Sequence, residues 1–380
     1  MVDEKDLPPP RSLAEQLSVA VPDPRALLVE MDRDPSAVIP PPAKVRALVG
    51  ELGLFGTQQA ATPELERERN ELLDFARRAV EALRQGLKPD VPLTREEEIG
   101  AAALLTFQKR PALLIQDDKF IEAQPPWQDE LGRLRKRIQR TLPSVGRVAI
   151  EGLDGVPWAG TGWLAAPGLI MTNRHVVKRF AEPSSSAGKE TRWRIKSGLA
   201  ARIDFSEEEK GAPGWDASRT FDVPADAKIA VHPEADLALV PVAGANRGPN
   251  PQLLPTPLVL APGGSAVTEG RKVYAVGYPA QDPFNPDPLS EYKLFQGIFN
   301  VKRLQPGQVL QVLTDKDTVL HDCSTLGGNS GSCLVDLATN QVVGLHYAGY
   351  HRRTNLAIAL WSLVGDPLLR EAGVRFYGEG

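Results

Sequence analysis

This sequence has few cysteines and a small net charge. Its 380 residues include only two cysteines, so a disulfide framework does not hold the fold together, as is usual in a reducing cytoplasm. The formal net charge is only -4 at pH 7, so no bulk field attracts nucleic acid or an anionic membrane. We expect neither nucleic acid nor membrane among the partners.

Long apolar runs and an export signal are also missing. The longest apolar run, Ile99 to Phe107, is interrupted by Gly100 and Thr106, whereas a membrane-spanning helix needs about 20 apolar residues. The first ten residues, MVDEKDLPPP, carry acids and prolines where a secretory signal would carry bases and then an apolar stretch. The sequence therefore predicts a soluble, cytoplasmic protein.

The length of the chain indicates more than one folded unit. Single hydrophobic cores stop growing at roughly 250 to 300 residues, and this chain has 380. Residues 1–42 are rich in proline and poor in aromatic residues, which predicts extended or disordered chain with at most a short helix. We assign no chemistry to this segment.

Residues 43–142 carry helical patterns and form a predicted helical module. Thr62 can cap a helix that has Pro63 at its first position, and Thr94 and Glu97 have the spacing of a capping box. The apolar stripe of the first helix consists of Leu65, Leu72, Ala76, Val80 and Leu83. A third stripe consists of Leu131, Leu134, Ile138 and Leu142.

Residues 143–380 change to short β-type runs separated by Gly, Pro and Asn. Many short strands without alternating helices predict antiparallel barrels or a sandwich. An amphipathic stretch over residues 361–372 predicts a closing helix, and the polar stretch 180–222 reads as a surface insertion. The sequence thus predicts an α+β multidomain protein, with a helical module followed by an all-β domain.

Two segments of the β domain carry residues of chemical interest. In GTGWLAAPGLIMTNRHVV, residues 160–177, two short strands joined by a Pro-Gly turn deliver His175 to the edge of a loop. In HPEADLALVPV, residues 232–242, Asp236 directly precedes a run that has the composition of a buried strand. A carboxylate that enters a core needs a partner, and a histidine N–H would serve.

A third segment, STLGGNSGSCLV, places glycines around Ser330, which permits a tight turn and leaves amide N–H groups free to point at a substrate. In the chain order His, Asp, Ser, the three motifs resemble those of the trypsin-like serine peptidases. The resemblance covers roughly residues 145–377. It implies an all-β, double-barrel, chymotrypsin-like peptidase domain with a C-terminal helix.

The resemblance also implies catalytic roles. Ser330 is the expected nucleophile, His175 the general base and then acid, and Asp236 the group that orients the imidazole and stabilises its cation. The backbone N–H groups of Gly328 and Ser330 are expected to form the oxyanion hole. The expected substrate is a protein or peptide, and no metal or other cofactor is required.

A narrower similarity concerns the specificity pocket. STLGGNSGS and GLHYAG are similar to segments of bacterial glutamyl endopeptidases, which implies a pocket lined by Ser324, Thr325 and His346. Ser324 stands where trypsin has an Asp on the pocket floor, so a basic side chain would lose its counter-charge. A hydroxyl and an imidazole can both hydrogen-bond a carboxylate, which implies a preference for Glu before the cut. The alternative is that His346 only packs between strands.

Asn329, directly before Ser330, bears on activation. Relatives that mature by clipping pair a new N-terminal amine with an Asp at this position, and an uncharged amide cannot form that ion pair. We therefore expect activation by clipping near Val145 to be unnecessary, with hydrogen bonds or a partner ordering the loop instead.

Several other residues have structural interpretations. His232 and His321 lie at predicted strand ends, where a histidine satisfied by its neighbours is the commoner explanation. Cys323 and Cys333 are expected to be small buried hydrophobes, with a disulfide or a thiol sensor as the alternative. The basic run over residues 133–140 is interpreted as a solvated helix face rather than a binding patch.

Two functional alternatives stay open at the level of sequence. One is a catalytically silent module that keeps the peptidase fold and binds a protein partner, and the other is an esterase or transacylase that uses the same triad. The helical module is not needed for peptidase catalysis, so we expect it to regulate the enzyme or to recruit a protein partner.

Overall fold

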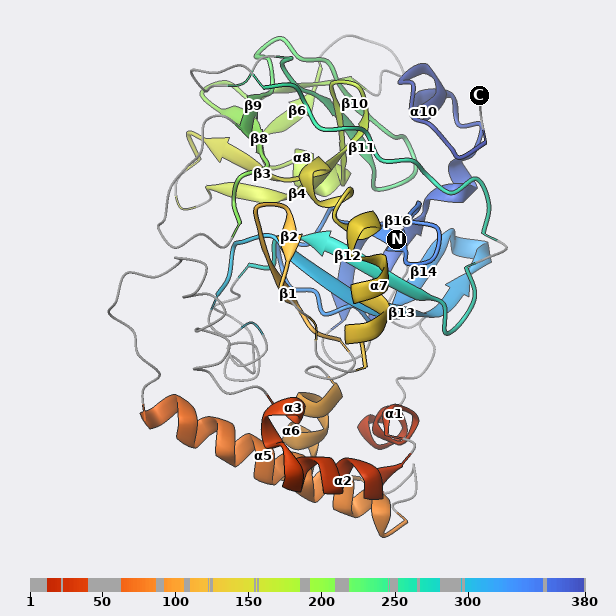
Figure 1. Cartoon of the computed structure of the whole chain (residues 1–380). Helices are drawn as coiled ribbons and strands as arrows, with labels where there is room; N and C mark the ends of the chain where they lie inside the picture. The colour runs from red at the N-terminus through yellow and green to blue at the C-terminus, as the bar shows by residue number, and fades with distance from the viewer. Residues whose placement is uncertain are drawn as a thin grey trace.

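The computed structural model describes most of the chain. The described residues are 12–21, 23–39, 63–86, 92–105, 110–121, 123, 126–153, 155, 157–184, 192–208, 219–244, 246, 252–264, 267–280, 295, 298–350 and 354–378. These residues form a group of helices and, above it in Figure 1, a domain built from two β-sheets.

The helical group, here called the helical bundle, comprises the helices that lie within residues 12–105. Its helices are α1 (Leu13–Ala20), α2 (Pro24–Arg33), α3 (Pro35–Val38), α5 (Pro63–Arg84) and α6 (Arg95–Leu104). Leu72, Ala76 and Val80 lie on the buried face of α5, as the predicted stripe requires. The capping box is also confirmed, because the N–H of Glu97 donates to Oγ1 of Thr94 and the N–H of Thr94 donates to Glu97.

The prediction of extended or disordered chain over residues 1–42 is wrong where the structure describes this segment. Three helices lie there, and their apolar residues join the core of the bundle. Two of the prolines, Pro24 and Pro35, occupy the first turn of a helix, where a missing N–H costs nothing. Asp23 and Asp34 cap those helices through their side chains. Proline therefore starts helices here instead of preventing them.

The second half of the β domain is a closed barrel. Its strands are β12 (Lys272–Gly277), β13 (Arg303–Leu313), β14 (Thr318–His321), β15 (Cys333–Asp336), β16 (Val342–Tyr350) and β17 (Thr354–Ala359). They pair in the order β12-β15-β16-β17-β14-β13, and an antiparallel β12–β13 ladder closes the ring.

The first half of the β domain is a nine-stranded antiparallel sheet. Its order is β6-β7-β10-β11-β5-β4-β3-β8-β9. The strands are β3 (Val145–Glu151), β4 (Trp158–Ala166), β5 (Leu169–Thr172), β6 (Ala181–Pro183), β7 (Arg192–Ile195), β8 (Ala200–Asp204), β9 (Thr220–Asp222), β10 (Ile229–Val231) and β11 (Ala238–Pro241). Residues 180–222 supply four of these strands, so interpreting them as a surface insertion was wrong. Half-buried and buried residues alternate over the first four residues of β8, and the polar sequence around the strand hides that alternation.

The β domain begins before residue 143. Strand β1 (Leu113–Gln116) pairs with β13 of the closed barrel and with β2 (Lys119–Phe120). Helix α7 (Gln128–Ile138) buries Leu131 and Ile138 in the core that both sheets share. The predicted helical module of residues 43–142 therefore ends too late. Its last part lacks a core of its own, because its apolar residues pack against the barrels.

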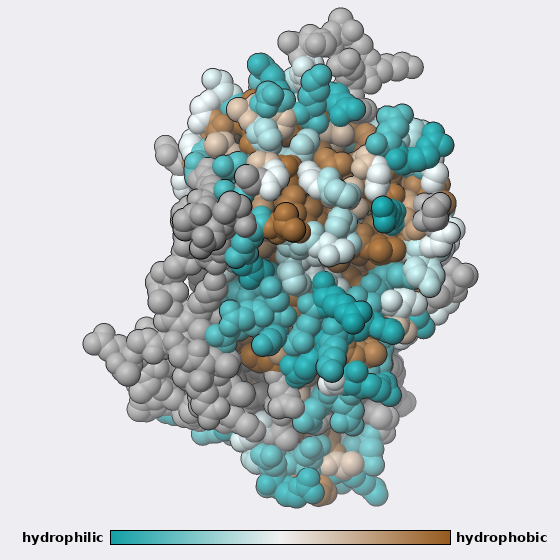
Figure 2. All heavy atoms as spheres, turned by 45° about the horizontal axis from the view of Figure 1, so that its top comes forward, coloured by the Kyte–Doolittle hydropathy of each residue, from teal (hydrophilic) through white to brown (hydrophobic). Residues whose placement is uncertain are grey.

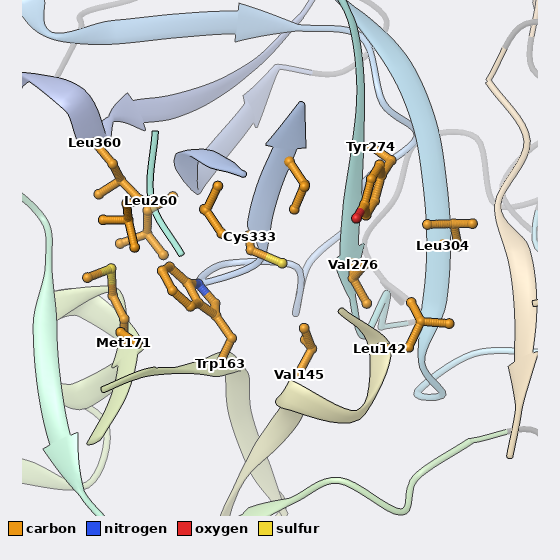
Figure 3. Packing of buried hydrophobic residues seen from close by; sticks show 14 of the residues in the cluster. Leu142, Val145, Trp163, Met171, Leu260, Tyr274, Val276, Leu304, Cys333 and Leu360 are labelled. Carbon is orange, nitrogen blue, oxygen red and sulfur yellow. The ribbon is translucent and has the colours of Figure 1, made fainter. Parts of the chain in front are cut away.

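One hydrophobic cluster joins the two sheets. Figure 3 shows Trp163 of the first sheet next to Cys333 of the second, and Met171 of the first sheet next to Leu260. The predicted fold class, helices followed by an all-β, chymotrypsin-like double barrel with a C-terminal helix, is confirmed. The closing helix is α10 (Pro367–Glu371), preceded by the short 3-10 helix η6 (Leu360–Leu363).

The surface of the described residues is mixed in character. Figure 2 shows hydrophobic residues gathered among hydrophilic ones over the upper part of the molecule and mostly hydrophilic residues below. Large apolar side chains such as Leu253 and Tyr377 are exposed singly. Over the part of the chain that the structure describes, no helix has both the length and the apolar character needed to cross a membrane.

Candidate active site

His175 lies on a single helical turn, α8 (Arg174–Val177), that follows β5 of the first sheet. Its ring Nδ1 lies 2.7 Å from Oδ2 of Asp236, and its backbone N–H donates to the other carboxylate oxygen at 3.0 Å. The carboxylate therefore fixes the orientation of both the ring and the backbone of His175. From the sequence, the position of Asp236 indicated a need for a partner such as a histidine N–H, and the resemblance to trypsin-like serine peptidases implied that this histidine is His175.

The loop that carries Asp236 is hydrogen-bonded to the two residues that precede His175. Asn173 donates from Nδ2 to the backbone carbonyl of Asp236 at 2.9 Å. Arg174 donates to the backbone carbonyls of His232 and Ala235. These contacts hold the two chain segments of the pair together independently of the His175–Asp236 hydrogen bond.

The electrostatics of the pair favour an ionised Asp236. Burial opposes the charge, but the hydrogen bonds and charge of His175, with Arg174, outweigh it and hold the pKa of the Asp236 carboxyl below its ordinary value. The His175 side chain is 43% exposed, whereas Asp236 is only 13% exposed. An exposed imidazole on a buried carboxylate can take a proton from solvent or substrate and stabilise the resulting cation.

Ser330 lies in the turn that leads from β14 into β15 of the second barrel, against β4 of the first sheet. Its carbonyl accepts a hydrogen bond from the N–H of Thr161 at 2.8 Å. Gly160 leaves room for this approach, since a Cβ there would lie 2.8 Å from the Ser330 carbonyl oxygen and 2.8 Å from Val176. Ser330 and the helical turn of His175 therefore flank the same glycine.

No hydrogen bond between Ser330 and His175 is recorded within the described residues. Such bonds are often long in a substrate-free site and tighten when substrate is bound. The neighbouring backbone is nevertheless fixed. The N–H of Gly331 donates to the carbonyl of His346 at 2.8 Å, and Thr161 donates from Oγ1 to the carbonyl of Gly328 at 2.8 Å.

Gly328 provides the backbone conformation of this turn. Its φ is +85°, and a Cβ there would come within 2.2 Å of the Trp158 ring and 2.5 Å of the Tyr278 carbonyl oxygen. Only glycine fits. The N–H groups of the neighbouring residues 329, 331 and 332 donate to backbone carbonyls. No such bond is recorded for the N–H of Gly328 or Ser330 within the described chain, which leaves both available as donors.

Asn329, between those two donors, is fully buried. Its Oδ1 accepts from Oγ of Ser332 at 3.3 Å, its Nδ2 donates to the carbonyl of Leu326 at 3.4 Å, and its carbonyl accepts from the N–H of Ser332. The turn is therefore ordered by internal hydrogen bonds in the intact chain, without a charged partner for residue 329.

The predicted pocket residues that precede Ser330 are both half-buried and hydrogen-bonded. Ser324 donates from Oγ to the backbone carbonyl of Arg110 at 2.6 Å. Thr325 donates from Oγ1 to Oδ1 of Asn355 on β17 at 2.5 Å. Both hydroxyls thus donate to residues outside the predicted pocket.

His346 on β16 is 2% exposed and stands beside His321 of β14, which is fully buried. His346 Nδ1 lies 3.2 Å from His321 Nε2, and the rings meet edge to face. Burial, and then the charge of His175, lowers the pKa of His346 to about 3. Burial, and then His346, lowers the pKa of His321 well below its ordinary value.

The pairing of His321 with His346 was missed by the sequence prediction, which gave His321 a structural role. The available signal was that both residues occur in β-type runs, but only the register of the strands between them brings the rings together. His232, the other histidine given a structural role, does have structural partners. Its Nδ1 accepts from the N–H groups of Glu234 and Ala235, and its Nε2 lies 3.1 Å from Asp366.

Cys323 and Cys333 are buried and free. Burial raises the pKa of the Cys333 thiol to about 12 and that of Cys323 well above its ordinary value. Both are therefore small buried hydrophobes, as predicted, and not a disulfide. Within the residues that the structure describes, no cluster of three or more His, Cys, Asp or Glu is suited to bind a metal ion.

Residues 160–345 match the model of the trypsin-like peptidase domain. The matched segment includes the His175–Asp236 pair and Ser330, and it supports a trypsin-like serine peptidase. Comparison with curated proteins gives no match.

Proposed function

We propose that this protein is a serine endopeptidase that cleaves peptide bonds through Ser330, His175 and Asp236. The observation that carries the proposal is the 2.7 Å contact between His175 and Asp236. Ser330 of the other barrel lies close by, because its carbonyl accepts from the N–H of Thr161 and approaches Gly160, which also lies against Val176 of the helical turn of His175. A buried carboxylate, an exposed imidazole and a serine in a tight turn have the chemistry of nucleophilic acyl transfer.

The mechanism follows from the hydrogen bond at Nδ1. Because Nδ1–H of His175 donates to Asp236, the lone pair of Nε2 is free to take the proton of Ser330 Oγ as that oxygen attacks the peptide carbonyl. The N–H groups of Gly328 and Ser330 receive the developing oxyanion. The imidazolium then protonates the leaving amine. Water, activated by the same nitrogen, hydrolyses the acyl-enzyme and returns the proton to Ser330.

The intact chain is proposed to be competent without cleavage. The hydrogen bonds of Asn329 with Leu326 and Ser332 order the turn beside Ser330, so no new N-terminal amine is required. This agrees with the expectation drawn from the uncharged amide at this position.

We further propose that the pocket prefers Glu before the scissile bond. His321 Nδ1 is buried without a hydrogen-bond partner among the described residues, and an orphaned buried N–H is rarer than an orphaned acceptor. We therefore assign the proton of His321 to Nε2, where it donates to Nδ1 of His346. That leaves the proton of His346 on Nε2, available to a carboxylate. The hydroxyl protons of Ser324 and Thr325 are already donated to the Arg110 carbonyl and to Asn355, so His346 is the proposed donor.

The helical bundle is proposed to regulate the enzyme or to recruit a protein partner in the cytoplasm. Its buried residues form a cluster separate from the core that both sheets share. A variant that starts at residue 106 should therefore keep a reactive Ser330 while its regulation or partner binding changes. A variant that starts at residue 141 lacks β1 and α7 and should not fold, because both contribute to the β domain.

The proposal is tested by mass spectrometry of peptides cut from a protein mixture by the purified protein. Wild type should produce new termini, enriched in Glu at the residue before the cut, and Ser330→Ala should produce none. Cleavage of simple esters with no peptide cleavage would indicate an esterase. No turnover of either class by wild type would indicate a silent binding module.

A further inference from the structure

The segment just before β1 lies against the segment that leads to Ser330. Ser324 donates from Oγ to the Arg110 carbonyl at 2.6 Å, and Arg110 Nε lies 3.1 Å from Oδ2 of Asp322. Arg110 thus contacts Ser324 of the proposed pocket through its backbone and Asp322, two residues earlier, through its side chain. The segment from Asp322 to Ser324 is here called the pocket wall.

This contact is partly shielded from solvent. The side chain of Arg110 is 22% exposed and that of Asp322 is 13% exposed. Ion pairs at such sites are screened less by salt than exposed pairs, and removing one partner leaves the other charge without compensation. The pair is therefore a better candidate for an energetic role than the more exposed ion pairs of the helical bundle.

The upstream segment is held firmly on its other side. Arg303, which is 1% exposed, donates from its guanidinium to the carbonyl of Ala112 at 2.7 Å. Leu113 and Leu114 then pair with β13 of the closed barrel. Arg110 therefore projects from a fixed edge of the barrel rather than from a free terminus.

The pocket wall is held from the barrel as well. Oδ1 of Asp322 accepts from the N–H of Gln308 at 2.6 Å, while Gln305 donates from its side chain to the carbonyl of Ser324. Asp322 and Ser324 thus stand between β13 and Arg110. Loss of Arg110 would remove its ion pair with Asp322 and leave the hydrogen bonds from Gln305 and Gln308 of β13.

We infer that Arg110 is a positioning residue for the specificity pocket and acts through Asp322 and Ser324. The inference rests on the proposed peptidase function.

Steady-state kinetics of the full-length protein test this role with peptides that differ only in the residue before the cut. Arg110→Ala should raise KM about tenfold for the preferred peptide and reduce selectivity by a similar factor, with kcat changed less than threefold. Arg110→Lys, which keeps the charge, should restore selectivity to within about threefold of wild type. A purely structural role would not separate KM from kcat or be rescued by lysine.

Asp322→Asn provides a second variant, because it removes the charge and keeps an oxygen for the N–H of Gln308. Its effect should match that of Arg110→Ala, and the double variant should be no worse than either single one. Arg84→Ala, which breaks an exposed pair with Glu81 in the bundle, is the matched control and should leave KM unchanged.

Labelling of Ser330 by a fluorophosphonate separates failure of the inference from failure of the proposed function. Labelled wild type together with unchanged KM and selectivity in both Arg110→Ala and Asp322→Asn would overturn the inference alone. Unlabelled, inactive wild type would overturn the proposed function on which the inference rests, and the inference with it.

Discussion

The β domain contains two pairs that involve histidine, and their surroundings differ. The first pair is His175 with Asp236, and the second pair is His321 with His346. His175 is 43% exposed and hydrogen-bonds a carboxylate, whereas His346 is 2% exposed and its ring partner is a second histidine. In the first pair, the Asp236 carboxylate can stabilise the positive charge of a protonated His175 ring. The second pair resists protonation, since burial lowers the pKa of both His321 and His346.

Histidine therefore differs between the two pairs because its partner and its burial differ. A general base must change its charge during each turnover, and an exposed imidazole on an ionised carboxylate does so. A neutral imidazole inside a barrel instead presents a fixed N–H or lone pair. The predictions below alter one pair at a time.

The largest effect is expected at the first pair. Asp236→Asn should lower kcat by about 10⁴-fold, because an amide that donates to Nδ1 forces the proton of the imidazole onto Nε2, where it cannot act as a base. Peptide hydrolysis measures this change, and circular dichroism checks the fold. Glu234→Gln, an exposed neighbour on the same loop, is the control and should stay within about twofold of wild type.

The second pair should lower the free energy of unfolding in acid. The unfolded state binds a proton at each histidine near pH 6.5, but the folded state leaves His346 neutral down to a pKa of about 3 and His321 neutral well below its ordinary pKa. As pH falls from about 6.5 toward 3, the unfolding free energy should therefore decrease by roughly 1 kcal/mol per pH unit through His346, and His321 should change it in the same direction.

Urea denaturation between pH 7 and pH 4.5 measures this slope. The double variant His321→Gln/His346→Gln should flatten it, although its stability at pH 7 will differ. The lowered pKa of Asp236 acts in a separate window, because its contribution is present above pH ~3.9 and is lost only as pH falls through the folded value. A slope that persists in the double variant above pH 5 would contradict this account of the second pair.

Substrate selectivity is the next effect in size. If Nε2–H of His346 donates a hydrogen bond to the Glu carboxylate of the substrate, His346→Ala should reduce the preference for Glu over Gln about 10-fold to 100-fold. The reason is that a hydrogen bond to a charged group contributes about 1.5–3 kcal/mol. The ratio of kcat/KM values on matched peptides measures it. An unchanged ratio would assign His346 to packing between strands.

The smallest effect is expected at His232, which supports the first pair from outside. His232→Ala removes the acceptor for the N–H groups of Glu234 and Ala235 and should lower kcat roughly tenfold by loosening the loop of Asp236. His232→Asn places an oxygen near the position of Nδ1 and should recover most of the loss. Equal kcat values for both variants would contradict the supporting role.

Local signals in the sequence predicted much of the fold and the site. The helix that begins at Pro63, the helix that Thr94 caps and the strand after Asp236 follow from capping residues and from patterns of apolar residues, which depend only on neighbours in the chain. The candidate triad could be predicted because each residue lies in a distinctive local segment.

The remainder depends on contacts between distant segments. The pairing of Leu113 with Leu304 and the meeting of His321 with His346 are set by strand register in the folded barrel, which no local pattern encodes. Proline misled the prediction for residues 1–42, because the same residue that favours extended chain also begins helices when Asp23 or Asp34 caps them.

The central claim is that the intact chain carries an activated Ser330. Full-length protein with its N-terminus verified by mass spectrometry should be treated with a fluorophosphonate and digested, and the modified residue identified. We predict one modification, on Ser330, that is absent from Ser330→Ala and slowed at least a hundredfold in Asp236→Asn. No modification of wild type, or modification only after cleavage near Val145, would contradict the account.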